Sequence, residues 1–226
     1  NHDRIIQPIE INGIDDDGDG LIDDFWGWDW VNADPGVVYP GEDPAPPDNN
    51  PMDFAGHGTH CSGDADARTN NALGVAAPGF GCQIMCLRAG YQSNETPYYP
   101  AYVETEAAIQ ATYYAIDHQV NVISMSYGGA SLDPAEADAL QAALNAGIIL
   151  VAAAGNDHST NFSYPAAYPG VIAVGATAPG DALADFTNYG TWITLCAPGV
   201  AIMSTMIGGY GNMSGTSMAT PVTAGV

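Results

Sequence analysis

Residues 215–221 are Gly215-Thr216-Ser217-Met218-Ala219-Thr220-Pro221, and residues 56–60 are Gly56-His57-Gly58-Thr59-His60. Each stretch places a reactive side chain, the Ser217 hydroxyl or the His57 imidazole, among small residues that let a backbone and a ligand approach closely. A third stretch, Ala152-Ala153-Ala154-Gly155-Asn156, ends in an amide side chain. An imidazole can accept a serine proton and an amide can donate to an oxyanion, so these side chains are candidates for nucleophilic catalysis.

Short apolar runs alternate with helical segments from Gly56 onward. The runs at 122–126, 148–152 and 171–175 predict buried strands. Helices are predicted at 104–118, from its apolar face, and at 134–146, which follows Asp133 as a cap, starts with Pro134 and stops at Gly147. Strands that alternate with helices predict an α/β fold of three layers, with a mostly parallel sheet and helices on both faces.

Two motifs follow strands in this prediction. Asn156 comes after the run at 148–152, and Ser126-Tyr127-Gly128-Gly129 comes after the run at 122–126. Functional groups gather at the carboxyl ends of strands in parallel sheets, so we expect both motifs to line one cleft.

Composition restricts the classes of partner. The chain has 226 residues, of which 46% are hydrophobic, and it carries 26 Asp plus Glu against 3 Lys plus Arg, a formal net charge of −23. The length suits one large domain with a sizeable core. The negative charge argues against nucleic acid and anionic membranes as partners, and no apolar run approaches the ~18 residues of a membrane span. We expect a soluble monomer.

The motifs together resemble the subtilisin-like serine proteases, or subtilases. Histidine, asparagine and serine occur in the family's order, and the similarity runs from about Ile11 to the last residue. It implies a subtilisin-like fold and a secreted serine endopeptidase that acts on proteins or peptides. The implied catalytic residues are His57 as base, Ser217 as nucleophile and Asn156 as oxyanion donor, whereas His60 is structural.

The same resemblance implies a substrate-binding region. Ser126-Tyr127-Gly128-Gly129 is similar to the family's S-x-G-G strand, and two glycines would let a peptide backbone lie alongside as an added strand. Gly155, beside Asn156, belongs to the same predicted region. Without the family pattern, an ordinary turn after a strand explains the segment equally well.

The aspartate of the family's catalytic triad is missing from its expected motif. The family places it in Asp-Thr-Gly or Asp-Ser-Gly at a strand end, and neither tripeptide occurs here. Asp3, Asp15 and Asp53 lack an apolar strand before them. We therefore expect the aspartate upstream of Asn1 and interpret residues 1–226 as one catalytic domain truncated at both ends and inactive alone, with loops at 1–55 and a core at 56–226. The alternative is a binding module that kept the fold and lost catalysis.

Residues 15–24 form an acidic loop, Asp-Asp-Asp-Gly-Asp-Gly-Leu-Ile-Asp-Asp. Its alternating carboxylates and its glycine match a calcium-binding loop, in which side chains at positions 1, 3, 5 and 9 and the carbonyl at position 7 would be ligands. The predicted ligands are therefore Asp15, Asp17, Asp19, Leu21 and Asp23. Position 12 is Trp26 and not the usual glutamate, so Asp24 is an alternative ligand. The competing interpretation is a solvated acidic loop without an ion.

Four cysteines, Cys61, Cys82, Cys86 and Cys196, lack the paired spacing of a zinc site. Cys82 and Cys86 are predicted in one strand, about 13 Å apart and unable to bridge each other. Cys61 is expected to be a buried thiol. The sequence leaves the disulfide pairing open.

Overall fold

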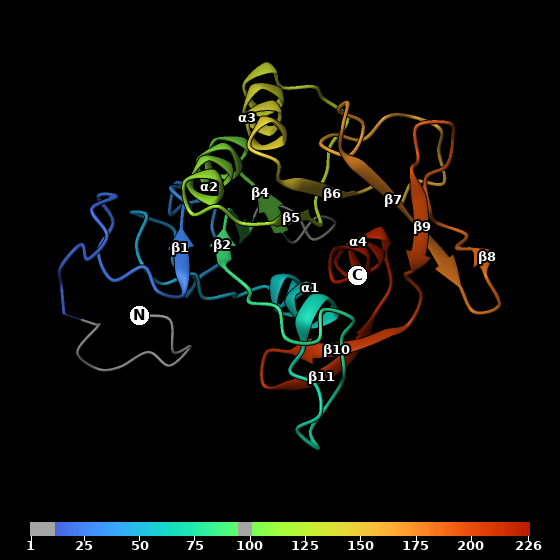
Figure 1. The fold of residues 1–226 in the computed structure, drawn as a ribbon, viewed down its shortest axis with the longest axis horizontal. Coiled ribbons are helices and arrows are strands. Elements are labelled where there is room, and N and C mark those ends of the chain that lie inside the picture. The colour runs from blue at the N-terminus through green and yellow to red at the C-terminus, as the bar shows by residue number, and fades with distance from the viewer. Residues whose placement is uncertain (1–11, 95–100) are drawn as a thin grey trace.

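The computed structural model describes residues 12–94 and 101–226, and its centre is a five-stranded sheet (Figure 1). The strands β5, β6, β7 and β9 run parallel, and β8 pairs antiparallel with β7. This confirms the mostly parallel sheet, and the three predicted strands are present as β5, β6 and β7. The strand bounds are β5 Val122–Met125, β6 Ile149–Ala153, β7 Ile172–Ala178, β8 Ala182–Leu183 and β9 Leu195–Pro198.

The two predicted helices are also present, as α2 (Thr105–Asp117) and α3 (Pro134–Asn145). Asp133 caps α3 as expected, because its Oδ1 accepts the amide N–H groups of Ala135 at 2.8 Å and Glu136 at 3.1 Å. Gly147 follows α3 with a φ of 85°, which only glycine adopts freely.

Alternate side chains of β6 pack into the cores on opposite faces of the sheet. Leu150 packs in one core cluster with Leu140 of α3, whereas Val151 packs in another cluster with Ala219 of α4 (Thr216–Ala224). Successive side chains of a strand point to opposite sides, so α3 and α4 cover opposite faces. The three-layer prediction is therefore confirmed.

A hairpin near the end of the chain packs against a helix near its start. The helix is α1 (His57–Asp66), and the hairpin pairs β10 (Ile202–Met206) with β11 (Gly209–Met213) (Figure 1). The approach is close, because a Cβ added at Gly63 would lie 2.1 Å from Thr205 Oγ1. Only a residue without a side chain fits at Gly63.

The described residues before α1, 12–56, are mostly loop, and a short strand within them pairs with a later part of the chain. Strand β1 (Gly27–Asp29) pairs in parallel with β2 (Cys86–Arg88), and β3 (Gly90–Gln92) pairs antiparallel with β4 (Ala101–Val103). Within the described ranges, no helix is long and apolar enough to cross a membrane.

Arg88, the last residue of β2, forms ion pairs with this loop segment. Its guanidinium donates to Glu42 at 2.7 Å and also contacts Asp29, and its side chain is only 7% exposed. Burial raises the pKa of Asp29 to about 6, although the Val31 amide and Arg88 oppose the shift. Arg88, one of only three Lys and Arg residues in the chain, is therefore buried and paired with two carboxylates.

The prediction that Cys82 and Cys86 share a strand is wrong. The chain turns at Phe80 and Gly81, which have φ values of 36° and 108°, and β2 begins only at Cys86. Cys82 lies in this turn and its thiol donates to the Gly79 carbonyl at 3.0 Å. All four thiols are free.

Candidate active site

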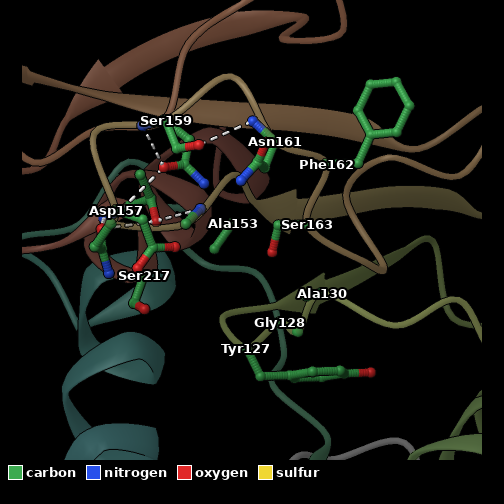
Figure 2. Close-up of a pocket in the computed structure, with 15 residues that line it drawn as sticks. Tyr127, Gly128, Ala130, Ala153, Asp157, Ser159, Asn161, Phe162, Ser163 and Ser217 are labelled. Atoms are coloured by element: carbon green, nitrogen blue, oxygen red, sulfur yellow. Dashed lines mark hydrogen bonds between the residues drawn. The ribbon is translucent and has the colours of Figure 1, made fainter.

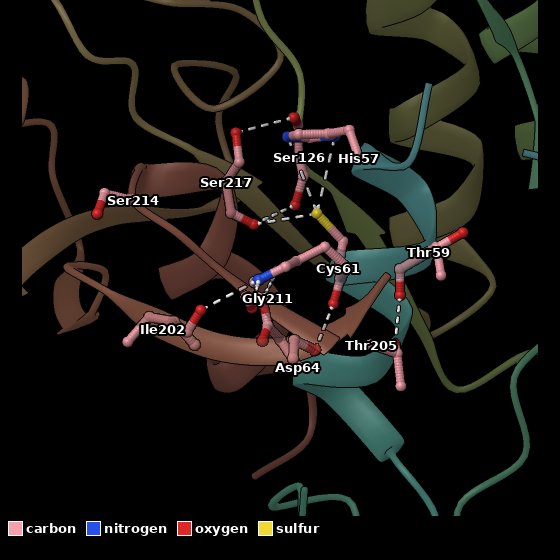
Figure 3. A network of polar contacts seen from close by, with 12 residues as sticks. His57, Thr59, Cys61, Asp64, Ser126, Ile202, Thr205, Gly211, Ser214 and Ser217 are labelled. Atoms are coloured by element: carbon pink, nitrogen blue, oxygen red, sulfur yellow. Dashed lines mark hydrogen bonds and ion pairs between the residues drawn. The ribbon is translucent and has the colours of Figure 1, made fainter. Parts of the chain in front are cut away.

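His57 and Ser217 lie at the N-terminal ends of two helices that meet at Cys61 (Figure 3). His57 is the first residue of α1 and Ser217 the second of α4. The Cys61 sulfur lies 3.8 Å from His57 Nδ1, and its thiol donates to the Ser217 carbonyl at 3.4 Å. The fold thus brings together two residues that are far apart in the sequence.

Two hydrogen bonds join Ser126 and Ser217. The Ser126 hydroxyl donates to the Ser217 carbonyl at 2.8 Å, and the Ser217 hydroxyl donates to the Ser126 carbonyl at 3.2 Å. No hydrogen bond joins His57 to Ser217 among the described residues. Proton transfer to His57 therefore requires the Ser217 hydroxyl to turn away from the Ser126 carbonyl, and such bonds often tighten only when substrate binds.

The environment of His57 combines burial with one nearby carboxylate. Burial lowers its pKa, the negative charge of Asp53 raises it, and His60 lowers it. A lowered pKa keeps the imidazole neutral, as a general base must be.

Asp53 supports the start of α1. Its Oδ2 accepts the Thr59 amide and the Thr59 hydroxyl, each at 2.7 Å, and its Oδ1 accepts the Gly56 amide at 2.9 Å. No hydrogen bond from His57 to a carboxylate is found in residues 12–94 and 101–226, and Asp3 lies outside these ranges. None of the described aspartates therefore orients the imidazole directly.

Asn156 follows β6, and Thr216 fixes its side chain. The Thr216 amide donates to Asn156 Oδ1 at 2.8 Å, and the Thr216 hydroxyl donates to the same atom at 3.0 Å. With its oxygen held on this side, the side-chain N–H₂ of Asn156 remains available as a donor next to Ser217. An amide N–H in this position can donate to an oxyanion.

A pocket of about 350 Å³ opens beside Ser217 (Figure 2). Its walls include the segment after β5 and the segment from Gly155 to Ser163. The two walls join where Gly129 and Tyr164 exchange backbone hydrogen bonds of 2.9 and 2.8 Å. The predicted substrate-binding residues Tyr127, Gly128, Gly129 and Gly155 line this pocket, whereas Ser126 contacts Ser217.

Glycines are required at two places in the pocket wall. A Cβ at Gly128 would lie 2.6 Å from Ser163 Oγ, and a Cβ at Gly155, where φ is 98°, would lie 2.5 Å from Asn188 Nδ2. Larger residues at either position would displace the pocket wall.

Asn188 is a structural residue of the pocket that the sequence analysis missed. Its Nδ2 donates to the Ala154 carbonyl at 2.8 Å, and its Oδ1 accepts the amides of Asp157 and Ser159 at 3.0 and 3.1 Å. It thereby holds the segment that follows Asn156. It stands in a loop with no motif or apolar period, so no sequence signal pointed to it.

The acidic loop meets α2 at a cluster of possible metal ligands. Asp17, Asp19, Asp24 and His118 each offer a ligand atom within 4.8 Å of the others. His118 Nδ1 lies 3.0 Å from the Tyr114 carbonyl, which can only accept, so Nδ1 carries the proton and Nε2 faces the carboxylates. Of the predicted ligands, the structure brings Asp17 and Asp19 together here, with Asp24 and the unpredicted His118.

The other predicted ligands have different contacts. Asp15 accepts the backbone amides of Gly18 at 2.6 Å and Gly20 at 2.9 Å, which lowers its pKa. Asp23 accepts the amides of Asn12 and Gly13 at 2.9 Å. The Leu21 amide donates to Asp19 at 2.8 Å. These bonds shape the loop around the four-residue cluster.

Residues 31–226 match the model of the subtilase family, so the chain belongs to this family of serine proteases. It is 41% identical over 202 residues to a thermophilic serine proteinase of Bacillus sp. (strain AK1), covering 88% of this chain and 49% of the relative. It is 38% identical over 192 residues to thermitase of Thermoactinomyces vulgaris, covering 84% and 66%. The chain thus spans about half the length of the first relative.

Solved structures support the same fold. A protease from Pseudoalteromonas arctica PAMC 21717 superimposes with a TM-score of 0.77 at 26% identity, covering 88% of this chain and 69% of the other. The prenylagaramide maturation protease PagA gives a TM-score of 0.66 at 27% identity, covering 77% and 63%. The architecture is therefore that of subtilisin-like proteases.

Proposed function

We propose that the protein containing this chain is a serine endopeptidase in which Ser217 attacks the peptide bond and His57 is the general base. The observation that supports this most is that the Cys61 thiol contacts both His57 and Ser217. Ser217 and Asn156 also line the pocket. A helix N-terminus favours developing negative charge, so the Ser217 position suits an oxyanion intermediate.

The reaction follows from these groups. The Ser217 oxygen bonds to the substrate carbonyl carbon as its proton passes to His57, and the Asn156 side-chain N–H binds the resulting oxyanion. His57 then returns the proton to the leaving amine, which leaves an acyl-enzyme that water hydrolyses. The peptide backbone would lie along the segment 126–129 as an added strand.

We propose that an aspartate outside residues 1–226 completes the triad, because no carboxylate in residues 12–94 and 101–226 is hydrogen-bonded to His57. Without an orienting carboxylate, turnover falls by ~10⁴ even where the geometry survives. The expected result is that the isolated chain hydrolyses peptides far more slowly than the full-length protein. Equal rates would show that an aspartate within residues 1–226 orients His57 and would contradict the proposal.

A fluorophosphonate probe tests the nucleophile directly. We expect the full-length protein to be labelled at Ser217, with the adduct located by mass spectrometry, and Ser217→Ala to abolish labelling. Ser214→Ala is the matched control, because this serine lies three residues before Ser217, between β11 and α4, and accepts the Ala201 amide at 2.8 Å. A folded protein that is neither labelled nor proteolytic would favour the alternative, a binding module with this fold.

We also propose that the acidic loop binds a structural calcium ion. Carboxylate oxygens are the ligands that calcium prefers, and three of the four clustered side chains, Asp17, Asp19 and Asp24, supply them. His118 is a less typical calcium ligand, and it faces the same cluster. Bound calcium would neutralise the mutual repulsion of these carboxylates and fasten the loop to α2, without a part in the chemistry.

The remaining expectations concern location and partners. We propose a secreted monomer that acts on proteins or peptides. Membership of the subtilase family supports the substrate class, and the charge of −23 disfavours nucleic acid and anionic membranes as partners.

A further inference from the structure

His60 lies one helical turn after His57 and is fully buried, with a side chain that is 0% exposed. Its Nε2 lies 3.1 Å from the Ile202 carbonyl and 3.2 Å from the Gly211 carbonyl. Its Nδ1 lies 3.0 Å from Oδ2 of Asp64, whose side chain is 2% exposed. One imidazole therefore joins α1 to both strands of the β10–β11 hairpin.

These partners determine where the protons are. Carbonyl oxygens only accept, so Nε2 carries a hydrogen. A carboxylate and an imine nitrogen cannot bond without a proton between them, so one further proton lies between Nδ1 and Asp64. The pair is then neutral overall, either as imidazolium with carboxylate or as imidazole with carboxylic acid.

Further bonds from the hairpin bind the same helical turn. The Ser204 hydroxyl donates to the His60 carbonyl at 2.9 Å, and the Thr205 hydroxyl donates to the Thr59 carbonyl at 2.8 Å. Together with the imidazole, these bonds fix the rotation and the axial position of the turn that carries His57.

We propose that His60 and Asp64 are a positioning pair, which holds one buried proton and sets the place of the His57 imidazole against the β10–β11 hairpin. The effect on catalysis rests on the proposed function, whereas the proton can be measured without any activity. Displacement of a catalytic group by ~1 Å can cost ~10² in rate, so a pair that fixes α1 acts on turnover through His57.

Few other ionisable groups are close to the pair. On α1 they are His57, Cys61 and Asp66, and in the preceding loop Asp53. Helix α4 and strand β10 contribute none, and Tyr210 is the one on β11. Burial raises the pKa of the Asp64 carboxyl, and the His60 imidazole opposes the shift. This direction agrees with a carboxyl that shares a proton.

The proton predicts how stability depends on pH. Above about pH 6.5, the unfolded chain has released the protons of both side chains, while the folded pair still holds one. The folded state then binds more protons, so this contribution to stability is complete below about pH 6.5 and is lost as pH rises. One proton corresponds to about a tenfold fall in the folding equilibrium constant per pH unit, until the folded pair also deprotonates.

Asp64→Asn separates the charge from the geometry. The asparagine N–H₂ can donate to a neutral Nδ1, so the bond persists without the extra proton. Asp64→Leu removes the bond. Thr112→Val is the control, because Thr112 is a buried residue of α2 whose hydroxyl donates to the Ala108 carbonyl at 2.8 Å, away from α1.

The experiment measures denaturant unfolding from pH 6 to pH 9 and peptide hydrolysis at pH 7.5, all in the full-length protein. We expect the wild type to lose stability with pH relative to Asp64→Asn, by about tenfold per unit in the ratio of their folding constants. We expect Asp64→Leu to lose at least about tenfold in kcat with little change in KM, Asp64→Asn to retain kcat within about twofold, and Thr112→Val to lose stability without loss of kcat.

Two results would overturn the proposal. Parallel pH curves for the wild type and Asp64→Asn would exclude the shared proton, whether or not the protein is a protease. A folded Asp64→Leu variant with unchanged kcat would exclude positioning of His57. If Asp64→Leu fails to fold, the pH curves of the other two proteins still decide the first point.

Discussion

Thr216 holds the Asn156 side chain by two hydrogen bonds to one oxygen, from its amide at 2.8 Å and from its hydroxyl at 3.0 Å. The Thr216 hydroxyl oxygen in turn accepts the Gly155 amide at 3.1 Å. The residue before the proposed nucleophile thus orients the proposed oxyanion donor.

Thr216→Val tests this orientation. Valine keeps the backbone N–H bond but removes the hydroxyl and leaves the Gly155 amide without its acceptor. A net loss of about 1 kcal/mol per hydrogen bond predicts a fall in kcat of about 3–10-fold. Removal of the donor itself in Asn156→Ala is expected to cost ~10²–10³. Steady-state kinetics with one neutral peptide should give this order of effects, and the opposite order would contradict the assigned roles.

The pH dependence of hydrolysis should report the charge of Asp53. Its carboxylate raises the pKa of His57, because a negative charge stabilises the imidazolium. Asp53→Asn keeps a side-chain oxygen for the Thr59 amide but removes the charge, so the acid limb of kcat/KM should move to lower pH. The measurement is a pH–rate profile of both proteins. A shift to higher pH would show that the carboxylate acts on His57 in some other way.

Cys61 should be nearly inert in the native protein. Burial raises its pKa to about 12 from a reference of 9.0, so the thiolate fraction falls by about 10³. Cys82 and Cys196 are exposed and serve as internal controls. Iodoacetamide at pH 8 should alkylate these two within a time that leaves Cys61 unmodified, and denaturant should abolish the difference. Equal rates in the native protein would mean that the junction of α1 and α4 opens readily.

Calcium removal should destabilise the fold. A ligand at ~100 times its dissociation constant adds ~2.7 kcal/mol to stability, which corresponds to a fall in Tm of about 5–10 °C on chelation. In the double variant Asp17→Ala plus Asp19→Ala, chelation should have no further effect. Thermal unfolding with calcium and with chelator measures both. A full response to chelator in the double variant would place the ion elsewhere.

The sheet and the helices at its two faces could be predicted because their signals are local. The apolar runs at β5, β6 and β7 and the Asp133 cap each act over a few residues. The residues that carry the motifs could be found for the same reason. The contact between His60 and Asp64 could also have been predicted from the sequence. Asp64 follows His60 by four positions, and residues with this spacing lie on the same face of a helix.

The contacts that complete the site are long-range and could not be predicted in this way. Asn188 holds the segment after Asn156 from a separate loop, and His118 reaches the acidic loop from α2. The apolar residues around Cys82 suggested an extended strand. That prediction failed because the chain turns at Phe80 and Gly81. A side chain whose partner is distant in the sequence produces no periodic pattern in the sequence around it.

The contact between α1 and the β10–β11 hairpin also has a consequence for synthesis on the ribosome. His60 meets Ile202 and Gly211 at sequence separations of 142 and 151 residues. At 5–20 residues per second, the ribosome needs about 7–30 s to make the intervening chain. During this interval α1 has no partner for its buried imidazole, and Ser217 has not yet been made. The proposed site therefore cannot assemble on the nascent chain until the hairpin and Ser217 have been made, late in the synthesis of these residues.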